Sequence, residues 1–171
     1  MLRAFDGTAP EVAESAYVDP QAVVIGDVTI GPEATVLPGA VIRADGGPVV
    51  LERRANVQDN VTIHADARGS GVFLKERAAV GHNAIVHNAT VGKRSLVGMH
   101  ATVLDNAVLE PRSVAAAKAL VTEGMRVKTG TLVGGAPAEV LRDEMDEFEL
   151  LFYVADRYAQ HIDGMESETV R

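Results

Sequence analysis

The sequence predicts an all-β solenoid, a parallel β-helix of hexapeptide repeats followed by a C-terminal α-helix. Apolar residues recur every six positions, and a small residue stands four positions after most of them. The first of these pairs are Val12/Ala16, Val18/Ala22, Val24/Val28, Ile30/Ala34 and Val36/Ala40. A six-residue period is typical of a parallel β-helix, and neither an α-helix nor a simple amphipathic strand produces it.

Each coil of the predicted solenoid consists of three hexapeptides. Residues about eighteen apart then stack at the roughly 4.8 Å spacing of paired strands. The leading aliphatic residues group into coils as 12/18/24, 30/36/42, 51/57/63, 74/80/86, 91/97/103 and 109/115/121. We expect these side chains to fill a narrow interior, with small residues and glycines such as Gly81 and Gly98 at or near the corners.

The periodicity also predicts the boundaries of the elements. Residues 1–137 are predicted to form the β-helix, with loop insertions at 43–50 and 65–73 where the period breaks. Residues 138–162 carry apolar residues at three- and four-residue spacing, which predicts a helix packed on the solenoid. The last residues, 163–171, are expected to form a frayed tail.

Composition restricts the function. The chain of 171 residues carries a formal net charge of −8 and no basic stripe, which argues against binding of nucleic acid. It contains no cysteine, so any metal site must use nitrogen and oxygen ligands. No apolar run approaches about 18 residues and no secretory leader is recognisable, which indicates a soluble cytoplasmic protein without a membrane segment.

Three histidines are the candidate metal ligands. His64 follows Ile63 and His87 follows Val86, so both lie at equivalent outward positions of the third face in adjacent coils. At one strand spacing, both imidazoles reach a single ion at about 2.0–2.1 Å. His82 lies on the second face of the coil that carries His87, and therefore points around a corner.

One chain thus offers two ligands in one direction and a third in another. We therefore expect a cyclic homotrimer in which His82 completes the neighbour's site. Three imidazoles leave a fourth position open for water, as in catalytic zinc sites. Each histidine alone is more simply an ordinary polar residue of a solenoid corner, but two stacked histidines with a third nearby favour metal binding.

Further polar side chains surround these positions. Arg43 lies below the first histidine in the same column with Asp45 two residues on, and this pair is either an interface clamp or a solvated surface ion pair. Asn56 and Gln58 alternate outward one coil below the third histidine, with Asp59 beside them. These amides are candidates for holding the catalytic water or an imidazole in place.

This set of motifs resembles the γ-class carbonic anhydrase family over nearly the whole chain. The matching segments are Arg43-Ala44-Asp45, Asn56-Val57-Gln58-Asp59-Asn60, Ile63-His64, Gly81-His82 through His87, Leu96-Val97-Gly98-Met99 and the exit motif Gly134-Gly135-Ala136-Pro137. The resemblance implies a left-handed β-helix and a homotrimer. It also implies a zinc ion (or Fe²⁺ or Co²⁺) bound by His64 and His87 of one subunit and His82 of the next.

The resemblance assigns roles to other residues as well. Arg43 and Asp59 would stabilise the interface, Gln58 would assist the hydroxide, and Tyr158 would match the family's active-site tyrosine. The archetypal enzymes place glutamates for proton transfer just after the Arg-Ala-Asp stretch and in a longer loop. In this chain glycines follow Asp45, and the segment 65–73 offers only Asp66. The chain also resembles the branch associated with phenylacetate degradation and carnitine metabolism, whose members are linked to thioester hydrolysis.

The sequence therefore predicts metal-dependent reversible hydration of CO₂ to bicarbonate at a site shared between subunits, with Gln58, Asn56 and Tyr158 contributing to catalysis. Three alternatives remain open. The same metal site would serve an acyl-CoA thioester hydrolase, or it would belong to a catalytically idle metal-binding trimer. Hexapeptide solenoids also include acyltransferases, which place one catalytic histidine at the interface and need no metal.

Overall fold

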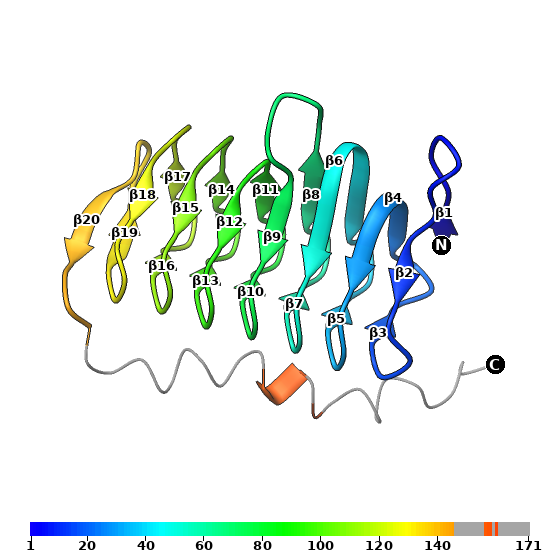
Figure 1. The fold of residues 1–171 in the computed structure, drawn as a ribbon. Helices are drawn as coiled ribbons and strands as arrows, with labels where there is room; N and C mark the ends of the chain where they lie inside the picture. Colours follow the sequence, from blue (N-terminus) through cyan, green and yellow to red (C-terminus); the bar gives the residue numbers. More distant parts are fainter. Residues whose placement is uncertain (146–155, 159, 161–171) are drawn as a thin grey trace.

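The computed structural model shows a solenoid of short parallel strands stacked along one axis (Figure 1). The structure describes residues 1–145, 156–158 and 160. Two faces of the solenoid belong to a 12-stranded sheet, because β4 (Val23–Ile30) and β6 (Val41–Leu51) continue around a corner from one face to the next. An 8-stranded sheet forms the remaining face. The predicted all-β solenoid is confirmed.

Most strands are only two to four residues long. The first face contains β2 (Glu11–Val12), β9 (Val72–Leu74), β12 (Thr90–Val91), β15 (Val108–Leu109) and β18 (Arg126–Val127). The second face contains β3 (Tyr17–Val18), β5 (Thr35–Val36), β7 (Asn56–Val57), β10 (Ala79–Val80), β13 (Leu96–Val97), β16 (Val114–Ala115) and β19 (Leu132–Gly134). The third face contains β1 (Leu2–Arg3), β8 (Thr62–Ala65), β11 (Ile85–His87), β14 (Thr102–Val103) and β17 (Leu120–Val121).

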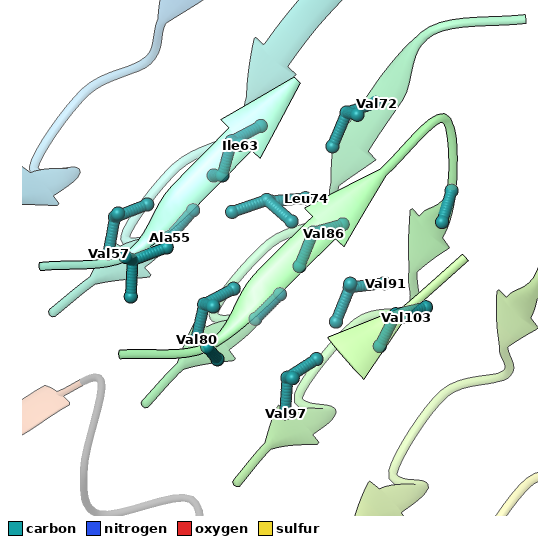
Figure 2. Packing of buried hydrophobic residues seen from close by; sticks show 14 of the residues in the cluster. Ala55, Val57, Ile63, Val72, Leu74, Val80, Val86, Val91, Val97 and Val103 are labelled. Carbon is teal, nitrogen blue, oxygen red and sulfur yellow. The ribbon is translucent and has the colours of Figure 1, made fainter. Parts of the chain in front are cut away.

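The strand register reproduces the predicted grouping into coils. On the third face, the residues in register are Val24, Ile42, Ile63, Val86, Val103 and Val121. The second and first faces carry equivalent columns through Val57 and Leu74, and these side chains are fully buried. Figure 2 shows side chains from the three faces directed toward one another in the interior. Burial of this continuous aliphatic column is the main stabilising term of the fold.

The corners are built differently from the expectation. The residue immediately before the small buried residue adopts a positive φ, as at Arg54 (φ 58), Arg77 (φ 59) and Arg112 (φ 60). Gly81 serves another purpose, because a Cβ atom there would lie 2.9 Å from the backbone nitrogen of Met99 in the next coil. Glycine at this position therefore permits the close approach of successive coils.

The two predicted insertions differ. Residues 66–71 form a loop between β8 and β9 that projects beyond the other corners (Figure 1), close to the predicted range 65–73. The predicted range 43–50 is too wide, because Arg43 and Ala44 pair with β4 and β8, and Val49 and Val50 pair with β4 and β9, so the extra residues are confined to 45–48 within β6. An irregular step in the register between β4 and β6 accommodates the extra residues.

The last parallel strand, β19, ends at Gly134, and the chain does not enter the helix predicted from 138. Glu139–Arg142 form β20, which pairs antiparallel with β19 and covers the open edge of the 8-stranded sheet. Helical residues are described at 156–158 and 160, where Asp156 accepts a hydrogen bond from Arg77 at 3.0 Å. Residues 143–145 are described and are not helical, whereas 146–155, 159 and 161–162 of the predicted helix and the tail 163–171 lie outside the described residues. Among the described residues, no helix has the length and apolar character to cross a membrane.

Candidate metal centre

Two histidines face each other on the third face of the solenoid. The register of β8 and β11 places His87 directly beside His64, one strand apart. Nδ1 of His64 lies 3.0 Å from Nε2 of His87, and the two ring centroids are 4.9 Å apart. Both side chains are about one-fifth exposed. The structure therefore directs one nitrogen of each imidazole to a common point at the surface.

A carboxylate holds the outer nitrogen of each ring. Nε2 of His64 lies 2.8 Å from Asp45, and Nδ1 of His87 lies 2.9 Å from Asp105. When these outer nitrogens donate their N–H to the carboxylates, both facing nitrogens of the neutral rings present lone pairs. A cation between them stabilises that arrangement, and a carboxylate behind a ligating histidine is its usual partner in metal sites. The donor set therefore fits a divalent metal ion.

A buried amide connects the carboxylates around this pair. Asn88 is fully buried, and its Nδ2 donates to Asp66 at 2.7 Å and to Asp105 at 2.9 Å. One ligand atom each of Asp66, His87 and Asp105 lie within 4.8 Å of one another. Sequence reasoning missed both Asn88 and Asp105. The available signal was the separation of 18 residues between His87 and Asp105, which places them in adjacent coils.

Hydrogen bonds lower the pKa of all three carboxyl groups near the pair. His64 and then Arg43 lower the pKa of Asp45. Arg68 holds the pKa of Asp66 far below its usual value, and the amide of Asn88, followed by His87, lowers that of Asp105. These groups are therefore anionic at neutral pH and favour a positive charge nearby.

The third candidate ligand lies around the corner on the second face. The backbone N–H of His82 donates to Oε1 of Gln58 at 3.2 Å, and Nδ1 of its ring lies 2.9 Å from Asp59. Gln58 donates in turn to Asn56 at 3.1 Å, and Asn56 donates to Thr35 at 2.6 Å. Asn56 and Gln58 are buried. This chain of amides fixes the backbone that carries His82.

A groove of about 800 Å³ extends from His82 along the second face. Its wall consists of Gln58, Gly81, His82, Leu96, Gly98, Met99, Val114, Ala115, Ala116, Ala117, Leu132, Arg157 and Tyr158. Tyr158, a candidate from the sequence, thus shares a groove with His82 and Gln58. The side chains of Asp156 and Arg77 fix the adjoining helical residues to the solenoid.

The predicted site residues therefore form two groups within one chain. Arg43, Asp45, His64 and His87 lie together on the third face, where Arg43 forms an ion pair with Asp45. Asn56, Gln58, Asp59, His82 and Tyr158 lie together on the second face. Asp45 and Asp59 each contact a histidine, a contact that the sequence interpretation did not include. Metal binding and the interface role of these residues remain predictions.

Comparison with known proteins identifies the relatives of this chain. No family model matches the sequence. The carnitine operon protein CaiE of Proteus sp. (strain LE138) is 36% identical over 146 residues, covering 85% of this chain and 74% of that protein. CaiE of Salmonella agona (strain SL483) is 37% identical over 144 residues, covering 84% and 72%.

Solved structures show the same fold. A hexapeptide transferase family protein from Anaplasma phagocytophilum superposes with a TM-score of 0.88 at 34% identity, covering 95% of this chain and 96% of that chain. A Bacillus cereus protein described as a candidate acetyltransferase gives a TM-score of 0.92 at 29% identity, covering 95% of both chains. The repeat, the register and these relatives together show that the chain belongs to the carnitine-operon CaiE branch of the γ-class carbonic anhydrase-like hexapeptide-repeat family.

Proposed function

We propose that this protein is a metal-dependent enzyme that reversibly hydrates CO₂ to bicarbonate at three-histidine sites in a homotrimer. The observation that carries the proposal is the facing pair of ring nitrogens, 3.0 Å apart, on His64 and His87. The outer nitrogens of both rings contact carboxylates, which leaves the facing nitrogens for a Zn²⁺, Fe²⁺ or Co²⁺ ion. His82 of a neighbouring subunit would supply the third ligand.

The separation of the two groups of residues supports assembly around a threefold axis. Within one chain His82 lies on another face, so it serves a different site from the one that its own His64 and His87 form. Each face also exposes a large apolar side chain near its histidines, Ile85 (41% exposed) on the third and Met99 (52% exposed) on the second. Burial of both in subunit contacts would stabilise the trimer.

The metal ion and the polar side chains would have different roles in the reaction. A divalent ion held by three imidazoles lowers the pKa of water at its open position, so that a nucleophile for CO₂ is available near neutral pH. Gln58 accepts a hydrogen bond from the backbone N–H of His82 and donates one N–H to Asn56. Its second N–H is then available to an oxygen of the substrate or product, and the buried contacts hold the amide in place.

Proton release depends on groups outside the carboxylate cluster. Asp45, Asp66 and Asp105 all have lowered pKa values, so each is a weak proton acceptor at neutral pH. We therefore infer that the proton leaves to solvent or buffer, and that the rate of hydration rises with buffer concentration.

A second candidate function is hydrolysis of an acyl thioester at the same metal site. The groove beside His82 has a volume of about 800 Å³ and includes Leu96, Val114 and Leu132, which is more space than CO₂ requires. An apolar groove of this size suits an acyl group. The transferase names of the structural relatives also concern acyl chemistry. Bound metal would distinguish CO₂ hydration and thioester hydrolysis, which both need the ion, from a metal-free acyltransferase.

The direct test is stopped-flow CO₂ hydration on protein loaded anaerobically with Fe²⁺, and separately with Zn²⁺ or Co²⁺, with metal content measured on the same samples. We expect metal-dependent hydration that increases with buffer concentration and is lost in His64→Ala. Stoichiometric metal without hydration would contradict the anhydrase proposal and favour thioester hydrolysis, which acyl-CoA substrates would then test.

A further inference from the structure

Asp105 contacts the candidate metal centre without reaching the metal position directly. It lies after β14, one coil beyond β11, and Oδ2 is 2.9 Å from Nδ1 of His87. The other nitrogen of that ring, Nε2, faces His64. Asp105 therefore contacts the side of the imidazole opposite to the candidate metal site.

We propose that Asp105 is a positioning residue that selects the tautomer of His87. By accepting the Nδ1–H, the carboxylate leaves Nε2 unprotonated and directed at the metal position. The benefit to metal affinity rests on the proposed metal site. The tautomer itself does not, because it is a property of the metal-free protein.

Asp105 accepts hydrogen bonds on both sides, because an ionised carboxylate has no proton to donate. Its Oδ1 accepts from Nδ2 of Asn88 at 2.9 Å, and its Oδ2 contacts the ring of His87. Nδ2 of Asn88 also donates to Asp66, and Oδ1 of the Asn88 side chain accepts from the backbone N–H of Asp66. These three contacts fix the orientation of the fully buried Asn88 amide. Only a carboxylate at position 105 accepts from both neighbours.

This geometry predicts an unusual order of effects for two substitutions. In Asp105→Asn, the amide oxygen turns to Asn88 and the amide NH₂ turns to Nδ1 of His87. The ring then accepts at Nδ1 and carries its proton at Nε2, where it blocks the metal. Asp105→Ala removes the acceptor but imposes no tautomer. The nearly isosteric substitution should therefore weaken metal binding more than the truncation does.

Asp66→Asn is the matched control. It removes the same charge and alters another acceptor of Asn88, but Asp66 lies on the other side of the His87 ring, 4.0 Å from Nε2, and does not accept from Nδ1. If charge alone determined metal affinity, Asp66→Asn and Asp105→Asn would have similar effects. A positioning role predicts that only the change at Asp105 moves the tautomer.

The experiment combines ¹⁵N NMR of the histidine ring nitrogens in the metal-free protein with Zn²⁺ titration against a competing chelator. The NMR is recorded well above the ordinary histidine pKa of about 6.5, so that the rings are neutral. We expect an Nδ1–H tautomer of His87 in the wild type and an Nε2–H tautomer in Asp105→Asn. Zn²⁺ affinity should fall by about 10–100-fold in Asp105→Asn. The loss should be smaller in Asp105→Ala and smallest in Asp66→Asn.

An Nε2–H tautomer in the wild type would overturn the inference, as would a larger loss of Zn²⁺ affinity in Asp105→Ala than in Asp105→Asn. If Asp105→Asn failed to fold, the wild-type tautomer would still decide, and Asp105→Ala should show a mixture of the two His87 tautomers in place of the Nδ1–H form alone. A wild-type protein that binds no Zn²⁺, Fe²⁺ or Co²⁺ would instead overturn the proposed function, and the tautomer would be judged separately.

Discussion

The third and second faces of the solenoid hold their histidines by different means. On the third face, carboxylates contact both rings, and His64 and His87 lie one strand apart. On the second face, buried amides fix the backbone of His82, and an apolar groove extends beside it. The third face therefore carries negative charge and two of the candidate metal ligands, whereas the second carries the third candidate and an apolar groove. Within the described part of the chain, neither face alone holds all three candidate histidines.

The largest effect is expected from removing a ligand of the third face. His87→Ala should abolish stoichiometric metal binding, because the proposed site would keep only two of its three imidazole ligands, His64 and the neighbouring subunit's His82. The fold should remain, since the ring lies outside the buried column that contains Val86. Metal analysis and circular dichroism would measure both. His100→Ala, at an exposed corner, is the control and should retain metal. Equal metal content in the two variants would refute the ligand assignment.

A smaller effect is expected at the proposed contact between subunits. Arg43 pairs with Asp45 in its own chain, and its side chain is 43% exposed, so further donors are available to a neighbour. If the trimer buries this group, Arg43→Ala should weaken association by about 2–5 kcal/mol. Sedimentation velocity over a dilution series would show dissociation. Arg53→Ala, which removes an exposed pair with Glu33, is the matched control. An unchanged profile for Arg43→Ala would show that the residue plays no part in assembly.

The smallest expected effect is a difference in acid stability of the metal-free protein. Asp45 and Asp105 have pKa values below the ordinary aspartate value of 3.8, so the folded state binds fewer protons than the unfolded state. Their contribution is present above pH 3.8 and is lost as the pH falls through the lowered folded values. Urea unfolding at a series of pH values should show stability falling with acid, less steeply in Asp45→Asn. Identical slopes in wild type and variant would contradict the assigned pairing.

The fold was predictable because its register follows directly from the six-residue period. Grouping Ile63 with Val86 placed His64 beside His87, and the same rule assigned His82 to another face. The six-residue period did not predict strand pairing where the paired residues lie outside the regular aliphatic pattern. Arg43, Ala44, Val49 and Val50 remain in the sheet because their backbone pairs with neighbouring coils, which the side-chain pattern does not record.

The supporting contacts of the site were less predictable. Asn88 and Asp105 lie at corners, outside the apolar pattern, and their importance depends on side-chain directions that spacing does not determine. Glu139–Arg142 have a helical apolar spacing but form a strand, because the open edge of the last coil offers backbone partners. Local periodicity cannot show such tertiary pairing.

The measurement that tests the shared site most directly is complementation between two inactive variants. His82→Ala and His87→Ala subunits are mixed under conditions that allow subunit exchange, and bound metal is then measured. A site that spans the interface is restored wherever an intact pair of His64 and His87 meets an intact His82, which gives about one site in four at equal mixing. Recovery of metal in the mixture, with none in either variant alone, is the predicted result. Mixed trimers that regain no metal would contradict the shared site.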